Sequence, residues 1–194
     1  MSIEKLEQHF DNYFPLNALE RDALNAFFVE RRIKRRQFVL QHDDVCRHFT
    51  FVVSGCLKMY AVDANDKEHN LEFIAENDWA MDLSSFYSEK PGKLYIEAVE
   101  PTTILQIRHD DVIHLYVHYP KFDHNFRVII EQKYIELQNR VLQNISSSAE
   151  ERYEYFLNQY PNLSTRLPNT QIASYLGITH EFLSTIRKTS AHKG

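Results

Sequence analysis

The feature that most constrains this chain is a stretch near its C-terminal end, residues 169–188. Apolar residues recur in its first half at helical spacing, and Gly177 then stands where a tight turn needs positive φ. The Thr179 hydroxyl can cap a second helix, in which Leu183 and Ile186 are spaced to face inward. This pattern predicts a helix-turn-helix, with a plain helical hairpin as the alternative.

The second helix is expected to turn mostly polar side chains outward. Side chains of these kinds can reach the base edges or the phosphates of duplex DNA. The predicted outward residues are His180, Glu181, Ser184, Thr185, Arg187 and Lys188. Residues 169–188 are therefore interpreted as an element that reads DNA.

The distribution of charge supports this interpretation. A net charge of −5 by itself opposes DNA binding, because phosphates repel an acidic surface. From residue 164 onward, however, four cations accompany one carboxylate, so this end carries +3 and the rest of the chain −8. The C-terminal end can therefore face phosphate while the acidic body faces away.

Length and composition narrow the class of protein. A chain of 194 residues suits one domain with a sizeable core plus a smaller second domain. No apolar run approaches the ~20 residues that span a bilayer, and the N-terminus lacks a signal-peptide pattern, so we expect a cytoplasmic protein without membrane contact. The two cysteines, Cys46 and Cys56, are too few for a disulfide scaffold and are expected to be reduced packing thiols.

Residues 37–108 read as short strands broken by turns, which is typical of an antiparallel sandwich or barrel. Two short helices are expected before them, at residues 3–14 and 15–29. The basic run at residues 31–36 leads into the first strand and is interpreted as a solvated face, not as a nucleic-acid patch. The strands predict a β-roll whose interior can shelter a ligand.

A long helix is predicted at residues 120–146, with apolar residues mostly every three or four positions. Its apolar stripe is wider than one β-roll needs, so a second copy of the chain can bury the surplus; an intramolecular helix laid across the sheet is the alternative. The residues expected in the dimer interface are Phe126, Ile130, Tyr134, Leu137, Val141 and Ile145. Ser148 and Glu151 then form a capping-box pattern that starts the next helix.

Together these elements predict an α+β protein. It has an N-terminal antiparallel, jelly-roll-like β-roll with two preceding helices, then a long dimerisation helix and a C-terminal helix-turn-helix domain. The predicted segments are residues 1–119, 120–146 and 147–194.

The order of these elements over the chain resembles the Crp/Fnr family of bacterial transcription regulators, most of all the branch common in Bacteroidetes-type bacteria. The most specific similarities lie in residues 53–57, 95–100, 148–153 and 172–178, with residues 182–184. The resemblance implies that the roll is like a cyclic nucleotide-binding domain. It also implies a homodimer that binds a palindromic promoter site in double-stranded DNA and contacts RNA polymerase.

Cyclic-nucleotide sensors of this family carry a phosphate-binding cassette, Phe-Gly-Glu followed further on by Arg and Ser or Thr. In this sequence Met81 stands at the cassette's glycine and Gly92 at its arginine, which removes the bidentate contact to phosphate. We therefore expect that cyclic AMP does not bind. The residues that can line a site for a different small-molecule effector are Trp79, Asp82, Ser84, Lys93 and Tyr95. A packed, empty roll is the alternative.

Carried over from the family, the base-reading positions fall on His180, Glu181 and Thr185. Glu181 can accept from a cytosine amino group, and His180 can donate to guanine or to phosphate. Thr185 stands where the family usually has Arg, so we expect one guanine contact to be absent. Phosphate contacts are expected from Arg187, Lys188 and Lys193 with help from Ser184 and Thr170, and Thr179 completes the predicted DNA-binding set.

A β-roll in a chain with ten histidines also suggests a metal enzyme of the cupin kind, but the chain has no His-x-His motif. His114 and His118 share a helical face without a third ligand at fixed spacing. We therefore expect no catalytic residues, no metal site and no cofactor. The alternative function is a β-roll module that binds a ligand or a protein without reading DNA.

Overall fold

The computed structural model describes the backbone of residues 2–191 and the side chains of residues 2–189. The chain divides into two compact units, one made of residues up to 61 and residues 72–132, the other of residues 62–71 and residues from 133 onward. This division differs from the three predicted segments, because a hairpin of the roll and half of the long helix pack with the C-terminal residues.

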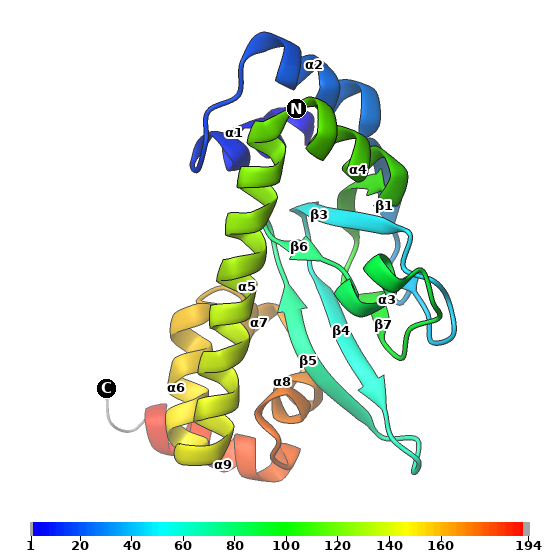
Figure 1. Cartoon of the computed structure of the whole chain (residues 1–194). Helices are drawn as coiled ribbons and strands as arrows, with labels where there is room; N and C mark the ends of the chain where they lie inside the picture. Colours follow the sequence, from blue (N-terminus) through cyan, green and yellow to red (C-terminus); the bar gives the residue numbers. More distant parts are fainter. Residues whose placement is uncertain (1, 192–194) are drawn as a thin grey trace. The chain divides into compact units, whose positions relative to one another are not determined.

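The predicted antiparallel β-roll is confirmed (Figure 1). Its strands are β1 (Val29–Ile33), β2 (Phe38–Leu40), β3 (His48–Ser54), β4 (Leu57–Val62), β5 (Glu68–Ile74), β6 (Trp79–Ala80), β7 (Tyr95–Ala98) and β8 (Thr102–Arg108). They form two four-stranded sheets, in the orders β1-β8-β3-β6 and β2-β7-β4-β5. The basic run does not simply precede the first strand, because Arg31 and Arg32 lie inside β1 and pair with β8.

Strand β3 is buried on both faces, and its two faces differ in character. Phe49 and Phe51 pack toward helices, with ring centroids 5.5 Å from Phe126 and 5.1 Å from His9. Because successive side chains alternate across a strand, Thr50 points the other way, into the space between the two sheets. There its Oγ1 accepts a hydrogen bond from Gln106 of β8 at 2.9 Å.

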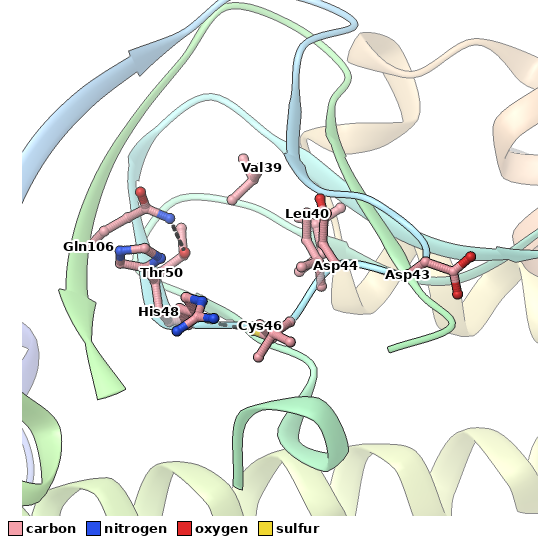
Figure 2. A pocket seen from close by; sticks show the side chains of 11 residues that line it. Val39, Leu40, Asp43, Asp44, Cys46, His48, Thr50 and Gln106 are labelled. Carbon is pink, nitrogen blue, oxygen red and sulfur yellow. Dashed lines mark hydrogen bonds between the residues drawn. The ribbon is translucent and has the colours of Figure 1, made fainter. Parts of the chain in front are cut away.

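The two sheets leave a cavity of about 300 Å³ between them (Figure 2). Leu40 of β2 and Ile96 of β7 line it from one sheet, and Thr50 and Gln106 line it from the other. The connection between β2 and β3 supplies further lining residues within residues 43–47. One wall of this cavity is therefore apolar and the facing wall is polar.

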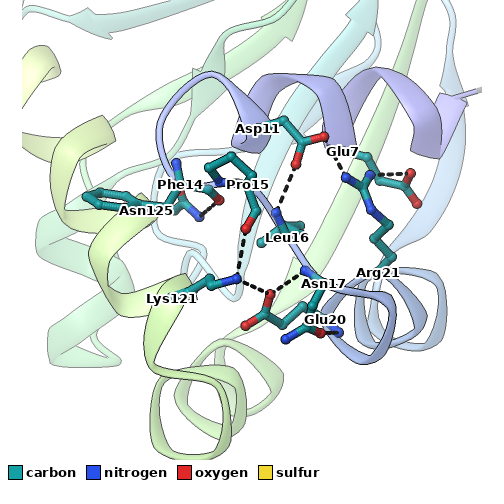
Figure 3. A network of polar contacts seen from close by, with 10 residues as sticks. All are labelled: Glu7, Asp11, Phe14, Pro15, Leu16, Asn17, Glu20, Arg21, Lys121 and Asn125. Atoms are coloured by element: carbon teal, nitrogen blue, oxygen red, sulfur yellow. Dashed lines mark hydrogen bonds and ion pairs between the residues drawn. The ribbon is translucent and has the colours of Figure 1, made fainter.

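Helices α1 (Ser2–Asp11) and α2 (Ala18–Phe27) precede the roll, and polar contacts tie their connection to the start of α5 (Pro120–Ser146) (Figure 3). Glu20 completes a capping box with Asn17, accepting from its backbone N–H at 2.7 Å, and also accepts from Lys121 at 3.1 Å. Asn125 donates to the carbonyl of Phe14 at 3.3 Å. The first turns of α5 are thereby fixed within the first unit.

The remaining helices are α3 (Leu83–Ser88), α4 (His109–His118), α6 (Ala149–Gln159), α7 (Leu163–Arg166), α8 (Asn169–Leu176) and α9 (His180–Ala191). Helix α6 begins with the predicted capping box: the backbone N–H of Ser148 donates to Glu151 at 2.7 Å, and that of Glu151 donates to the Ser148 hydroxyl at 3.2 Å. The buried apolar residues of the C-terminal helices are Tyr153, Phe156, Leu163, Leu167, Ile172, Ala173, Tyr175, Leu176, Leu183 and Ile186.

Candidate nucleic-acid interface

The turn between α8 and α9 has the predicted geometry. Gly177 adopts a left-handed φ of 69°, and the N–H of the next residue, Ile178, donates to the carbonyl of Ala173 at 3.0 Å. Helix α9 begins directly after Thr179, whose Oγ1 accepts a hydrogen bond from the N–H of Phe182 at 3.2 Å. The glycine turn and the threonine cap expected from the sequence are both confirmed.

Helix α9 buries one face and exposes another. Leu183 and Ile186 are 0% and 3% exposed, which confirms that they face inward. Of the residues predicted to contact DNA, Ser184 is half-buried and the exposed ones are Thr170, Thr179, His180, Glu181, Thr185 and Lys188. At 3.6 residues per turn, four residues share an arc of about 100° on the outer face of α9: Glu181, Ser184, Thr185 and Lys188.

Glu181 is an ionised acceptor on this face. Its pKa is lowered because the carboxylate accepts from its own backbone N–H and from the side chains of His180 and Thr179. The His180 Nδ1 lies 3.1 Å from the Glu181 Oε1. A carboxylate that only accepts hydrogen bonds suits the amino group of cytosine.

Arg187 does not share the exposed face, which corrects the prediction that its side chain is turned outward. Its guanidinium donates to the carbonyl of Ser164 at 3.1 Å and lies 5.7 Å from the centre of the Tyr153 ring. Because Arg187 follows Leu183 by four positions, it lies on the inward side of the helix. This side chain holds α9 against its own domain. Lys193, the other predicted phosphate contact beside Lys188, lies outside the described residues.

Helix α8 is bound by the hairpin between β4 and β5, which belongs to the same compact unit. Asn70 of this hairpin is 3% exposed; its side chain donates to the carbonyl of Gln171 at 3.0 Å and its backbone N–H to the Ser174 hydroxyl at 3.2 Å. That hydroxyl donates in turn to the carbonyl of Glu68 at 2.9 Å. Nothing in the sequence pattern indicates this contact, because its partners are about a hundred positions apart.

Arg140 of α5 binds both the hairpin and α8. Its guanidinium donates to the carbonyls of Asn70 at 2.7 Å and Tyr175 at 3.1 Å, and it lies 4.0 Å from the centre of the Tyr175 ring. Tyr175 belongs to the last turn of α8, where carbonyl groups have no partner within the helix and a cation is favourable. Arg140 is therefore a structural support of the helix-turn-helix that the sequence did not reveal.

The segment that corresponds to the cyclic-nucleotide cassette already contains a buried acidic side chain. Asp82 is 6% exposed, and its carboxylate accepts from the backbone N–H of Ser85 at the start of α3 at 3.1 Å. A side chain at position 92 would collide with this carboxylate, so Gly92 cannot be replaced by a larger residue without movement of Asp82. A bound phosphate would meet repulsion here.

The five residues predicted to line an effector site do not line the cavity of Figure 2. Trp79 is buried in the aromatic core, Asp82 caps α3, and Tyr95 stacks on another tyrosine with ring centroids 5.0 Å apart. Ser84 and Lys93 are exposed. The polar wall of the cavity comes from other residues, on β3 and β8.

The second half of α5 carries an exposed apolar face. Its members, each 50–79% exposed, are Tyr134, Ile135, Leu137, Val141, Leu142 and Ile145. At 3.6 residues per turn they span an arc of about 160°. Ile130, which was also predicted in the dimer interface, is half-buried. The prediction for Phe126 is wrong, because this residue is 1% exposed and its ring centroid lies 5.2 Å from that of Trp79 in the core of the first unit.

Among the residues that the structure describes, no three His, Cys, Asp or Glu side chains are grouped as a metal site requires, and no helix has the length and hydrophobicity to cross a membrane. His114 and His118 stack on each other with ring centroids 4.0 Å apart. Cys46 and Cys56 are buried and unbridged, and burial raises the pKa of the Cys46 thiol.

A β-roll, a long helix and a C-terminal helix-turn-helix follow one another along this chain. Residues 30–119 match the family model of the cyclic nucleotide-binding domain. No curated protein matches the chain by sequence.

Solved structures with the same fold cover most of the chain. FixK2 from Bradyrhizobium japonicum has a TM-score of 0.75 at 16% identity, over 86% of each chain. The c-di-GMP responsive global regulator CLP from Xanthomonas campestris has a TM-score of 0.74 at 14% identity, over 92% of this chain and 93% of that one. A protein from Eubacterium rectale assigned to the Crp/Fnr transcriptional regulators has a TM-score of 0.70 at 17% identity, over 94% of this chain and 89% of that one. This chain has the fold of the Crp/Fnr transcription regulators, and its residues 30–119 match the model of the cyclic nucleotide-binding domain.

Proposed function

We propose that this protein is a transcription regulator that binds duplex DNA through α9. The observation that carries the proposal is the exposed polar face of α9, presented by a helix whose Leu183 and Ile186 are buried and whose start is fixed by Thr179. A helix supported in this way can enter the major groove and present donors and acceptors to base edges. The regulators that share the fold support the same function.

The residues of this face have different roles in the proposal. Glu181 reads a base, because its ionised carboxylate is 78% exposed and directed by His180. Lys188 is exposed and contacts phosphate, which neutralises charge without reading sequence. Ser184, Thr185 and Thr170 add polar contacts beside them.

The protein binds DNA as a homodimer in this proposal. The apolar face of α5 at residues 134–145 is exposed, as is typical of a protein–protein interface, and a second copy of the same helix can cover it. Two copies of α9 related by a two-fold axis then match a palindromic site, and the bound dimer contacts RNA polymerase in the cytoplasm. Cyclic AMP is not the effector, because Asp82 supplies the negative charge at the start of α3; calorimetric titration should show no binding at micromolar concentrations.

Mobility-shift assays test the proposal directly. A binding site is first selected from random duplexes, and affinities for this site and for a scrambled duplex are then measured at two salt concentrations. Glu181→Ala should weaken binding to the selected site alone, whereas Lys188→Ala should weaken both and reduce the salt slope by about one unit per protomer. Glu154→Ala, on the exposed surface of α6, is the matched control.

Two results would reject the proposal. One is binding without steep salt dependence, or no binding at all, which would leave a roll that binds a ligand or a protein. The other is equal loss on both duplexes from Glu181→Ala and Lys188→Ala, which would remove α9 as the reading helix.

A further inference from the structure

We infer that the cavity between the two sheets of the β-roll is a binding site for a small carboxylate with a short apolar chain. The cavity is lined by residues of β2, β3, β7 and β8 and of the β2–β3 connection, and not by the cassette segment at residues 80–93. The inference does not depend on DNA binding.

The polar wall of the cavity offers hydrogen-bond donors. Thr50 is 1% exposed, and its hydroxyl accepts from the Gln106 amide at 2.9 Å; among the described residues no acceptor takes the hydroxyl proton. The Gln106 carbonyl accepts from Arg31 at 2.6 Å, and one amide N–H donates to Thr50, so the second N–H is left to donate to a ligand. His48 adds an imidazole N–H beside them. Because buried donors are normally paired, this wall calls for an acceptor.

The electrostatics of the same wall favour a negative acceptor. Burial lowers the pKa of His48, and the neighbouring guanidinium groups of Arg31, Arg108 and Arg47 lower it further, against the opposing effect of Asp111. Burial and the neighbouring positive charges therefore both favour the neutral form of the His48 imidazole. An oxyanion placed at this wall would receive hydrogen bonds and relieve the repulsion among the cations.

The other lining residues and the volume of the cavity determine the apolar part and the size of the ligand. Val39, Leu40 and Ile96 line the cavity with apolar side chains. Asp43 and Asp44 lie on the side away from His48, Thr50 and Gln106 (Figure 2), and the Asp43 carboxylate is 3.1 Å from His42. At the volume that a water molecule takes in the liquid, ~30 Å³, the cavity holds a molecule of about ten non-hydrogen atoms.

Calorimetric titration of the full chain with hexanoate tests the inference. Hexanoate should bind to one site per chain at least tenfold more tightly than either hexanol, which has the same tail without the charge, or acetate, which has the charge without the tail. Thr50→Val should weaken hexanoate binding about tenfold, the effect of one hydrogen bond to a charged group. Thr103→Val on β8, the strand that pairs with β3, lies outside the cavity lining and should leave the affinity unchanged.

Val39→Trp provides a second measurement, because an indole at this position on β2 fills the cavity. Hexanoate binding should be abolished, and circular dichroism should show that the fold is intact. Equal affinities for hexanoate and hexanol would overturn the inference. So would an absence of saturable binding, equal losses from the two threonine variants, or undiminished binding by a folded Val39→Trp protein.

Discussion

Replacement of Arg140 by methionine tests how α8 is held. Methionine keeps much of the apolar stem of arginine and removes the guanidinium that donates to the carbonyls of Asn70 and Tyr175. Each hydrogen bond from a charged group contributes about 1.5–3 kcal/mol, and the contact with the Tyr175 ring about 0.5–2 kcal/mol. Because Arg140 is half-buried, water can replace part of this interaction energy in the variant. We therefore expect the free energy of local opening of α8 to fall by about 2–4 kcal/mol.

Native-state hydrogen exchange followed by mass spectrometry measures this loss. The amides of α8 should exchange roughly 30- to 700-fold faster in Arg140→Met, the factor that corresponds to the expected change in opening free energy. Arg140→Lys keeps the charge but has only a point-like ammonium, so its effect should be intermediate. Arg127→Met is the matched control, because Arg127 lies on the same helix, is exposed and contacts only its helical neighbour His124 among the contacts described, at 2.6 Å.

Unchanged exchange of the α8 amides in folded Arg140→Met would refute this account of the contact. An equal acceleration in α8 and in the strands of the first unit would also refute it, since that pattern reports global destabilisation and not release of one helix.

Three further substitutions have defined outcomes. Gly177→Ala should cost about 1–2 kcal/mol in thermal unfolding from backbone strain alone, because φ is 69° and an added Cβ meets no atom within 4 Å; no loss would contradict the turn. Leu142→Glu, at a position 62% exposed, should convert a dimer to a monomer in sedimentation equilibrium without loss of helix content; an unchanged mass would exclude this face as the interface. For His48, the lowered pKa means that the unfolded chain binds a proton more readily, so stability is present above pH 6.5 and is lost as the pH falls below it. Between about pH 7.5 and about pH 5.5, the free energy of unfolding measured with urea should fall less in His48→Gln than in the original protein. An identical fall in both proteins would contradict this prediction.

The local features of the fold were predictable because their causes lie within a few residues. Gly177 is needed for a left-handed turn, Thr179 for a cap, and Ser148 with Glu151 for a capping box, and each is found in the predicted role. The contacts of Arg140 were not predictable, because its acceptors are backbone carbonyls 70 and 35 positions away and any residue type supplies a carbonyl.

The polar wall of the cavity left a weak signal in the sequence. Thr50 lies between Phe49 and Phe51, and Gln106 lies between two apolar neighbours, so each is a polar residue within an otherwise apolar strand. Strand alternation places both toward the space between the sheets. Their pairing across β3 and β8 could not be read from the sequence, because it depends on the register of two strands 56 positions apart.

The two corrected side chains, Phe126 and Arg187, have one cause in common. Each was assigned from its residue type, an aromatic ring to the dimer stripe and a cation to phosphate, although the helical angle argues otherwise. Phe126 follows Phe122 by four positions and shares its buried face, and Arg187 follows Leu183 by four positions. The angular position of a residue around the helix axis, and not its residue type, determines whether its side chain faces the core. A side chain that faces the core is held there by its neighbours whatever its charge. The same criterion retains Glu181 and Lys188, which lie on the face of α9 opposite Leu183 and are both exposed. The proposed interface therefore depends on one acceptor and one cation per helix, and these two are the residues whose replacement discriminates sequence reading from phosphate binding.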